Sequence, residues 1–322
     1  MARLLKRFIV LSMTTLLSIS MFSVVGFAQD DAQSTVYVQS QRELINAAKN
    51  SSKAEKIILE NDIILSKNLV LSKTVVLDMN GHKIVFAPGY CCKIGMCTID
   101  KKTKEYNYVD DISVKIENGT MQGAYGRDGM DGINGYIIQN VLAGAMKNGG
   151  KAKDGKSCIE VISGNLFINN STIMGGNGGN GGNGKRAYAS IISTTAGRGG
   201  NGGNGGYAIL QGRGCVVASK SKIVGGNGGI GGNGGNTDTS VGRASRGGNG
   251  GNGAVPVNIV SGTFNAVSGT ELIGGKGGSY GNGGLERSIR QSNGSCGHNA
   301  SAKCVGVYTL DDTCKEIDEV TD

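Results

Sequence analysis

The sequence predicts an all-β fold: a right-handed parallel β-helix with a short N-terminal capping helix and stacked glycine-rich excursions of polyproline-II type. Three observations predict it. Short segments rich in β-branched residues recur along the chain, and runs of Gly-Gly-Asn triplets follow them. The glycine that opens each outward run falls at 123, 175, 225 and 274, with spacings of 52, 50 and 49 residues. A fixed period of this size is typical of a solenoid or a stacked array.

The first 28 residues are expected to be a secretion signal. A basic start (Arg3, Lys6 and Arg7) precedes an apolar stretch, and small residues of a cleavage site end at Ala28. Cleavage after Ala28 lowers the formal net charge from +8 to +5. No later segment is long and apolar enough to span a membrane. The mature protein is therefore expected to be extracellular or on the cell surface.

All eight cysteines follow Ala28, and an even number of cysteines in an exported protein predicts disulfides. Cys296 and Cys304 form the simplest local pair, and the other pairings are open. A metal site near His82 is the alternative, but the spacing matches no standard zinc pattern, so no metal or cofactor is expected. The candidate disulfide cysteines are Cys91, Cys92, Cys97, Cys158, Cys215, Cys296, Cys304 and Cys314.

Residues 29–112 are expected to form the N-terminal cap and the first coils. Ser40 and Glu43 fit a capping box for a short helix that ends near Lys49. Strand-like runs follow at 56–60, 63–66, 69–72, 74–79 and 82–86, with an Asn80-Gly81 turn before the last.

Residues 42–84, from REL through KIILENDIILSKNLVLSKTVVLDMNGHKI, resemble the start of secreted right-handed β-helix proteins of the pectate-lyase-like superfamily. In those proteins a short helix plugs the first coil. The resemblance implies an architecture and carries no catalytic motif.

Residues 113–310 are expected to form about four units of about fifty residues, each a β-helix coil with one glycine-rich excursion. A polyproline-II helix has three residues per turn, so a strict triplet places one residue type along each edge. In the second unit two edges are glycine, and the third carries Asn177, Asn180 and Asn183. Coils stack about 4.8 Å apart, so neighbouring excursions lie too close for side chains but suit glycine. Two layers of such runs, outgoing and returning, are expected.

The first and last excursions differ from the middle ones. Side chains such as Tyr125, Arg127 and Met130 fill edges of the first excursion, and Lys276 and Tyr280 interrupt the last. Atypical terminal repeats are expected caps of a stacked array. Residues 311–322 are expected to form an acidic C-terminal tail.

The triplets are also similar to the polyglycine-II bundle of a snow-flea antifreeze protein and to the glycine-rich receptor-binding tips of certain T-even-like phage tail fibres. Both resemblances rest on the triplet alone. They imply a local fold and assign no residue roles.

Basic residues gather at the excursion tips, where a rigid scaffold usually presents its binding residues. We expect a secreted, non-catalytic, adhesin-like protein that binds a glycan or another anionic surface polymer through these tips. The alternative, that the basic residues only keep the tips solvated and apart, stays open. The sequence has no nucleic-acid-binding motif, so nucleic acid is not the expected partner, and the oligomeric state is open. The candidate binding residues are Lys185, Arg186, Tyr188, Arg198, Arg243, Arg246, Arg287 and Arg290.

Two alternatives remain open at this point. The regularly spaced asparagine edges form a flat polar lattice, which favours binding to ice. The pectate-lyase-like start favours a polysaccharide lyase or hydrolase by analogy alone. Asp128 and Asp131 lie about 9 Å apart on one edge, a separation that suits an inverting glycosidase, although no catalytic residues are expected.

Overall fold

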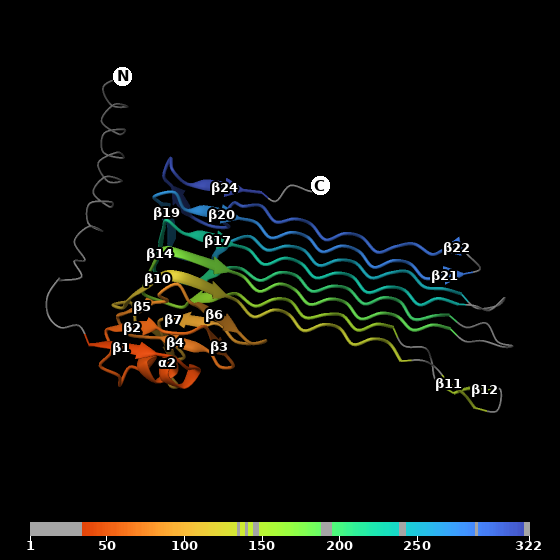
Figure 1. Cartoon of the computed structure of the whole chain (residues 1–322), viewed down its shortest axis with the longest axis horizontal. Coiled ribbons are helices and arrows are strands. Elements are labelled where there is room, and N and C mark those ends of the chain that lie inside the picture. Colours follow the sequence, from red (N-terminus) through yellow and green to blue (C-terminus); the bar gives the residue numbers. More distant parts are fainter. Residues whose placement is uncertain are drawn as a thin grey trace, which may run out of the picture. The chain divides into compact units, whose positions relative to one another are not determined.

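The structure is a computed structural model that describes residues 34–133, 136–138, 141–143, 148–187, 195–237, 243–286 and 289–318. The expected secretion signal, with its cleavage site after Ala28, lies outside the described residues. The described chain is all-β with long parallel sheets and a single short helix (Figure 1). The expected all-β class is therefore confirmed.

Parallel strands stack in three columns, and successive passes of the chain add a strand to each (Figure 1). The first column contains β1 (Thr35–Val38), β2 (Lys56–Leu59), β5 (Val75–Asp78), β10 (Ser113–Gln122), β14 (Asn165–Met174), β16 (Cys215–Ser219), β19 (Thr263–Val267) and β23 (Tyr308–Leu310). The second contains β3 (Ile63–Leu65), β6 (Lys83–Phe86), the second halves of β10 and β14, β17 (Lys222–Val224), β20 (Glu271–Ile273) and β24 (Lys315–Ile317). The third contains β4 (Leu69–Leu71), β7 (Cys92–Ile94), β13 (Ile159–Val161), β15 (Ile209–Gln211) and β18 (Val257–Ile259).

The core lies between the columns because alternate residues of each strand point inward. In the first column, Leu77 pairs in register with Ile116, and Ile116 pairs with Ile168. The same row continues to Ala218 and Ala266, and all five side chains are buried. Burial of each of the three larger side chains, Leu77, Ile116 and Ile168, contributes about 1.5–3 kcal/mol. The strict register therefore follows from the burial of one face of every strand.

The helix α2 (Gln41–Ala48) packs on the first strands, as the sequence predicted. The Ser40 hydroxyl accepts a hydrogen bond from the Glu43 N–H, and the Glu43 carboxylate accepts one from the Gln39 N–H. The first bond satisfies a donor that the first helical turn leaves free, and the second ties the residue before the N-cap to the helix. Leu44, on the inner side of α2, is fully buried, so the helix covers the apolar side chains of the first strands.

Two segments differ from the expected organisation. A hairpin of β8 (Cys97–Ile99) and β9 (Tyr106–Tyr108) is inserted before β10, where only coil strands were expected. Within the expected acidic tail, β24 pairs in parallel with β20, because its backbone continues the second column. Residues 319–322 lie outside the described part.

The excursions leave the coils after the second column and return before the third (Figure 1). We define the outgoing runs and the return runs by their residues. The outgoing runs are 123–133, 175–187, 225–237 and 274–286, and the return runs are 148–156, 195–207, 243–254 and 291–300. Two short hairpins lie at the far ends of the first and last excursions (Figure 1). They are β11 (Tyr136–Ile138) with β12 (Val141–Ala143), and β21 (Leu285–Glu286) with β22 (Ile289–Arg290).

Backbone hydrogen bonds with a three-residue period join the runs. The first glycine of a triplet donates within its layer, as Gly178 does to the carbonyl of Asn227 at 2.8 Å. The second glycine donates to the other layer, as Gly203 does to the carbonyl of Gly179 at 2.9 Å. The expected layers of outgoing and returning runs are thus held by a continuous hydrogen-bond lattice.

The lattice has no room for side chains at its inner glycine positions. A Cβ atom at Gly203 would lie 2.0 Å from the carbonyl oxygen of Lys153, and one at Gly178 would lie 2.0 Å from that of Gly203. Real Cβ atoms do not approach backbone oxygens this closely, since packed interiors leave few voids. Close backbone approach is therefore the physical reason for two glycines in each triplet.

The last runs close the lattice with side chains. No outgoing run follows 274–286 in the described chain, so its first-glycine donors lack the usual carbonyls. The amide oxygens of Asn299 and Asn293 accept from Gly277 at 2.7 Å and from Gly283 at 2.9 Å. The degenerate last excursion is therefore a cap, as the sequence predicted.

Candidate functional site

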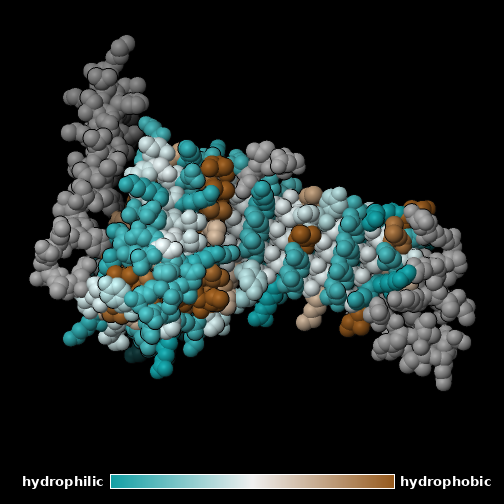
Figure 2. Space-filling model, viewed as in Figure 1, coloured by the Kyte–Doolittle hydropathy of each residue, from teal (hydrophilic) through white to brown (hydrophobic). Residues whose placement is uncertain are grey.

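The third residue of each triplet forms a ladder on the outer side of its layer. The amide oxygen of Asn177 accepts from the N–H of Asn227 at 2.9 Å, and the amide oxygen of Asn227 accepts from Lys276 at 2.8 Å. In the return layer, Asn201 accepts from the N–H of Asn249 at 3.0 Å. Figure 2 shows the result as hydrophilic stripes that cross the array between pale stripes.

The ladder explains why the third residue is asparagine. Its backbone N–H faces outward and has no carbonyl partner, so a short side-chain acceptor on the preceding run must satisfy it. Aspartate serves the same purpose in the first runs: Asp128 and Asp131 accept from Asn180 and Asn183 at 2.6 and 2.7 Å. These two carboxylates are therefore engaged in the lattice, which is a structural role.

Ile230 interrupts one ladder and provides a test of this interpretation. The Ile230 N–H donates to the amide oxygen of Asn180 at 2.9 Å, but the aliphatic side chain of Ile230 offers no acceptor to the Ser279 N–H on the next run. The change Ile230→Asn should raise the free energy of unfolding by about 1 kcal/mol, the usual net value of one hydrogen bond. Urea denaturation measures it. Ile230→Ala is the control, and equal stability of the two variants would contradict the ladder.

The structure places three of the candidate arginines together on the return layer. Arg198, Arg243 and Arg246 occupy third positions and are exposed. Arg198 and Arg246 are neighbours in register, because the Gly199 N–H donates to the carbonyl of Arg246. Arg243 precedes Arg246 by one triplet. We call Arg198, Arg243 and Arg246 the arginine triad.

Negative charge nearby compensates the triad only in part. No ion pair to these three side chains occurs among the described residues. The Glu286 carboxylate lies beside the triad, since it accepts from the Ala244 N–H at 3.3 Å. The arrangement can therefore attract an extended anion.

The other candidate residues lie elsewhere. Arg186 occupies a third position of an outgoing run, whereas Lys185 stands in a second-glycine position and accepts from the Gly197 N–H through its carbonyl at 2.9 Å. Arg290 is exposed in β22. Tyr188 and Arg287 lie outside the described residues. The structure thus separates the tip residues between two layers.

The eight cysteines are all free thiols in the structure, and their pairing stays a prediction. Cys91, Cys92 and Cys158 are fully buried on neighbouring rungs of the third column, where the Cys92 N–H donates to the carbonyl of Cys158 at 2.9 Å. Burial raises the pKa of Cys91 to about 12. Of the simplest predicted pair, Cys296 is exposed and Cys304 is buried.

Sequence reasoning missed a polar groove of about 780 Å³ at the corner between the first and second columns. Residues with positive φ stack along it: Asn80, Asn118, Asn170, Lys220 and Ser268. Asparagine, which tolerates this conformation, lines the earlier part of the groove. The recurring Asn-Gly and Ser-Gly dipeptides at 80, 118 and 268 were a signal that could have revealed it.

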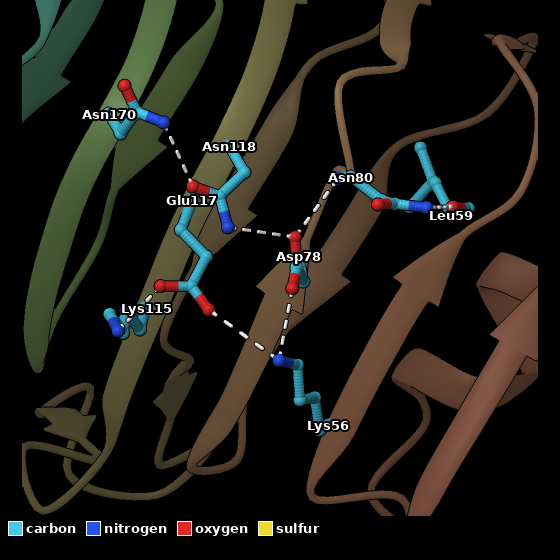
Figure 3. A network of polar contacts seen from close by, with 8 residues as sticks. All are labelled: Lys56, Leu59, Asp78, Asn80, Lys115, Glu117, Asn118 and Asn170. Carbon is cyan, nitrogen blue, oxygen red and sulfur yellow. Dashed lines mark hydrogen bonds and ion pairs between the residues drawn. The ribbon is translucent and has the colours of Figure 1, made fainter.

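An ordered polar network occupies one end of the groove (Figure 3). The Asn170 amide donates to Asn118, and the Asn118 amide donates to Asp78, each at 3.1 Å. The Lys56 ammonium lies 3.0 Å from Asp78 and 3.8 Å from Glu117. Burial raises the pKa of Asp78, but hydrogen bonds and the Lys56 charge outweigh it, so the pKa is lower than usual.

Two further findings limit the chemistry of the described part of the chain. It contains no group of three or more His, Cys, Asp or Glu side chains suited to a metal ion. It also contains no helix that is long and apolar enough to cross a membrane.

No protein-family model and no curated protein matches this chain. Among solved structures, it is similar to a springtail antifreeze protein from Granisotoma rainieri, described as a bundle of nine polyproline type II helices whose crystal waters match the ice lattice. The identity is 21%, the match covers 54% of this chain and 94% of that chain, and the TM-score is 0.11.

Proposed function

We propose that the protein is a secreted, right-handed parallel β-helix of the pectate-lyase-like type, with polyglycine-II excursions that hold a binding surface. Strand pairing at intervals close to fifty residues supports the β-helix, and the three-residue hydrogen-bond period supports polyglycine II. The expected signal at 1–28 supports export.

The proposed function is non-catalytic, adhesin-like binding of an anionic glycan or another anionic surface polymer. The arginine triad is the single observation that carries it. Along a run, successive third positions lie about 9 Å apart, and neighbouring runs lie about 5 Å apart. Guanidinium groups bind sulfate, phosphate and carboxylate in bidentate geometry. A polymer with repeated anionic groups can contact all three residues at once, because the lattice beneath them is rigid.

Charge removal at the triad tests the proposal. The variant with Arg198, Arg243 and Arg246 all changed to alanine should bind an immobilised sulfated or phosphorylated glycan roughly tenfold more weakly or worse, as three partly exposed charges are lost. Salt-gradient elution and surface plasmon resonance measure the loss.

The control removes the same charge elsewhere. Lys220, Lys222 and Lys303 are exposed, and changing all three to alanine lowers the net charge equally. This variant should keep near-native retention. Equal losses in both variants would mean that net charge, and not the triad, controls binding.

Ice binding is the second candidate, favoured by the regular ladder on the outgoing layer. The ladder uses the amide oxygen of each supporting asparagine, and these asparagines are exposed. The antifreeze activity named for the springtail protein belongs to that protein. Thermal hysteresis of the purified protein decides the matter, and its absence at high concentration removes this candidate.

A further inference from the structure

The hydrogen bonds of the lattice run in one direction, and this leaves backbone donors without partners at its first edge. Across layers, each second-glycine N–H donates toward the preceding run: Gly179 donates to Lys153, and Lys153 donates to Arg127. The run 123–133 has no preceding run. Within the described part of the chain, the backbone N–H groups of Ala124, Arg127 and Met130 have no hydrogen-bond partner. Ala124 is buried, whereas Arg127 and Met130 are exposed, so the last two carry the free donors at the surface of the first edge.

Cationic side chains gather at the same edge. Arg127, Lys153 and Lys156 line a pocket of about 290 Å³, which we call the edge pocket. Its remaining lining is Pro88, Gly89, Tyr125, Gly126 and Asp154. Arg127 and Lys153 stand in second-glycine positions, where the first edge leaves room for a side chain.

The charges of the edge pocket are only partly compensated. Among the described residues, neither Arg127 nor Lys153 has an ion-pair partner. Lys156 lies 2.8 Å from Glu160, and this hydrogen bond raises the pKa of Lys156. The Asp154 carboxylate accepts from the Asn204 N–H at 2.7 Å and is engaged in the ladder. Arg127 and Lys153 thus carry no ion pair, and the lining keeps an excess of positive charge over the single carboxylate of Asp154, next to the free Arg127 N–H.

We propose that the edge pocket binds a single oxyanion group, a sulfate or phosphate ester or the free ion. Backbone N–H groups together with Arg and Lys side chains are the usual donors for such anions. The site is preorganised, because the lattice fixes the backbone of both runs that carry it. It is separate from the arginine triad and does not depend on the proposed function.

The pocket is unsuited to a second copy of the array. A further run on this edge would need to meet a glycine at the second position, since a Cβ atom at the equivalent Gly179 would lie 2.4 Å from a neighbouring backbone oxygen. Arg127 and the exposed Met130 occupy those positions here. They block edge-to-edge growth of the lattice, in the way that charged residues protect sheet edges.

Titration of the ¹⁵N-labelled protein with sulfate, phosphate, a sulfated monosaccharide and a phosphorylated monosaccharide tests the proposal. The Arg127 amide signal should shift in a saturable way with at least one of these probes. Arg127→Gln and Lys153→Gln should each weaken that binding by about tenfold, the loss expected for one charge-assisted contact. The tighter of the two esters identifies the source of the anion.

Two controls make the result decisive. Lys222→Gln removes a comparable exposed lysine and should leave the affinity unchanged. The triple alanine variant of the arginine triad should also leave it unchanged, so failure here is distinct from failure of the proposed function. Absence of saturable shifts with all four probes, or equal weakening by Lys222→Gln, would overturn the proposal.

Discussion

Replacement of Gly229 by alanine is expected to destabilise the array strongly, although it adds only one methyl group. A Cβ atom at this position would lie 1.8 Å from the carbonyl oxygen of Gly179. The clash is with backbone that is itself hydrogen-bonded, so no side-chain rotation relieves it. We expect a loss of about 3 kcal/mol or more, the upper part of the range for overpacked sites. Urea denaturation followed by circular dichroism measures the change.

Gly150→Ala is the matched control for this prediction. Gly150 belongs to the first return run, where the nearest atom to an added Cβ is the Met130 nitrogen at 3.0 Å. A shift of a few tenths of an ångström accommodates that contact, so the loss should be less than about 1 kcal/mol. If the two variants were equally stable, tight packing of the inner glycines would not be the source of the array's order.

Removal of one ladder acceptor should have the next largest effect. The amide oxygen of Asn233 accepts from the Asn282 N–H at 2.9 Å, and Asn233→Ala leaves that donor without a partner. The outer face is exposed, so water compensates in part. We therefore expect a loss of about 1 kcal/mol, at the lower end of the cost of an unsatisfied donor. Thermal or urea denaturation measures it, and hydrogen exchange at Asn282 should become faster.

Asn282→Ala is the control that distinguishes the loss of a ladder hydrogen bond from the loss of an asparagine side chain alone. Asn282 lies in the last outgoing run, and within the described chain no later run uses its amide oxygen. Its loss should change the free energy of unfolding by less than about 0.5 kcal/mol. If Asn282→Ala lowered the free energy of unfolding strongly, or Asn233→Ala did not lower it, the ladder hydrogen bonds would not be what stabilises the outgoing layer.

The strands and the layers could be predicted because their signals are local. The triplets fix a three-residue period, and the spacing near fifty residues brings equivalent runs together. The Ser40 and Glu43 pair identified the start of α2 for the same reason. Neither inference needs knowledge of distant contacts beyond the register of the repeat.

The distribution of the tip residues was harder to predict, because it depends on the phase of the triplet. Arg198 and Arg246 continue the asparagine phase and reach the outer face, whereas Lys185 continues a glycine phase. Counting in threes from Asn201, Asn249 and Gly182 would have separated them. The structural roles of Asp128 and Asp131 could not be predicted by counting alone, because the direction of the backbone hydrogen bonds decides which run supplies the acceptor.

The directional lattice also makes the protein extensible in whole units. In the unit 175–224, the described residues 175–187 and 195–224 receive donors from the unit before them and supply acceptors and donors to the unit after them. A duplicated copy of this segment would find matching neighbours above and below without any new side chain. The first and last runs carry side chains at their outer edges, so a change of length by whole middle units would leave both ends unaltered.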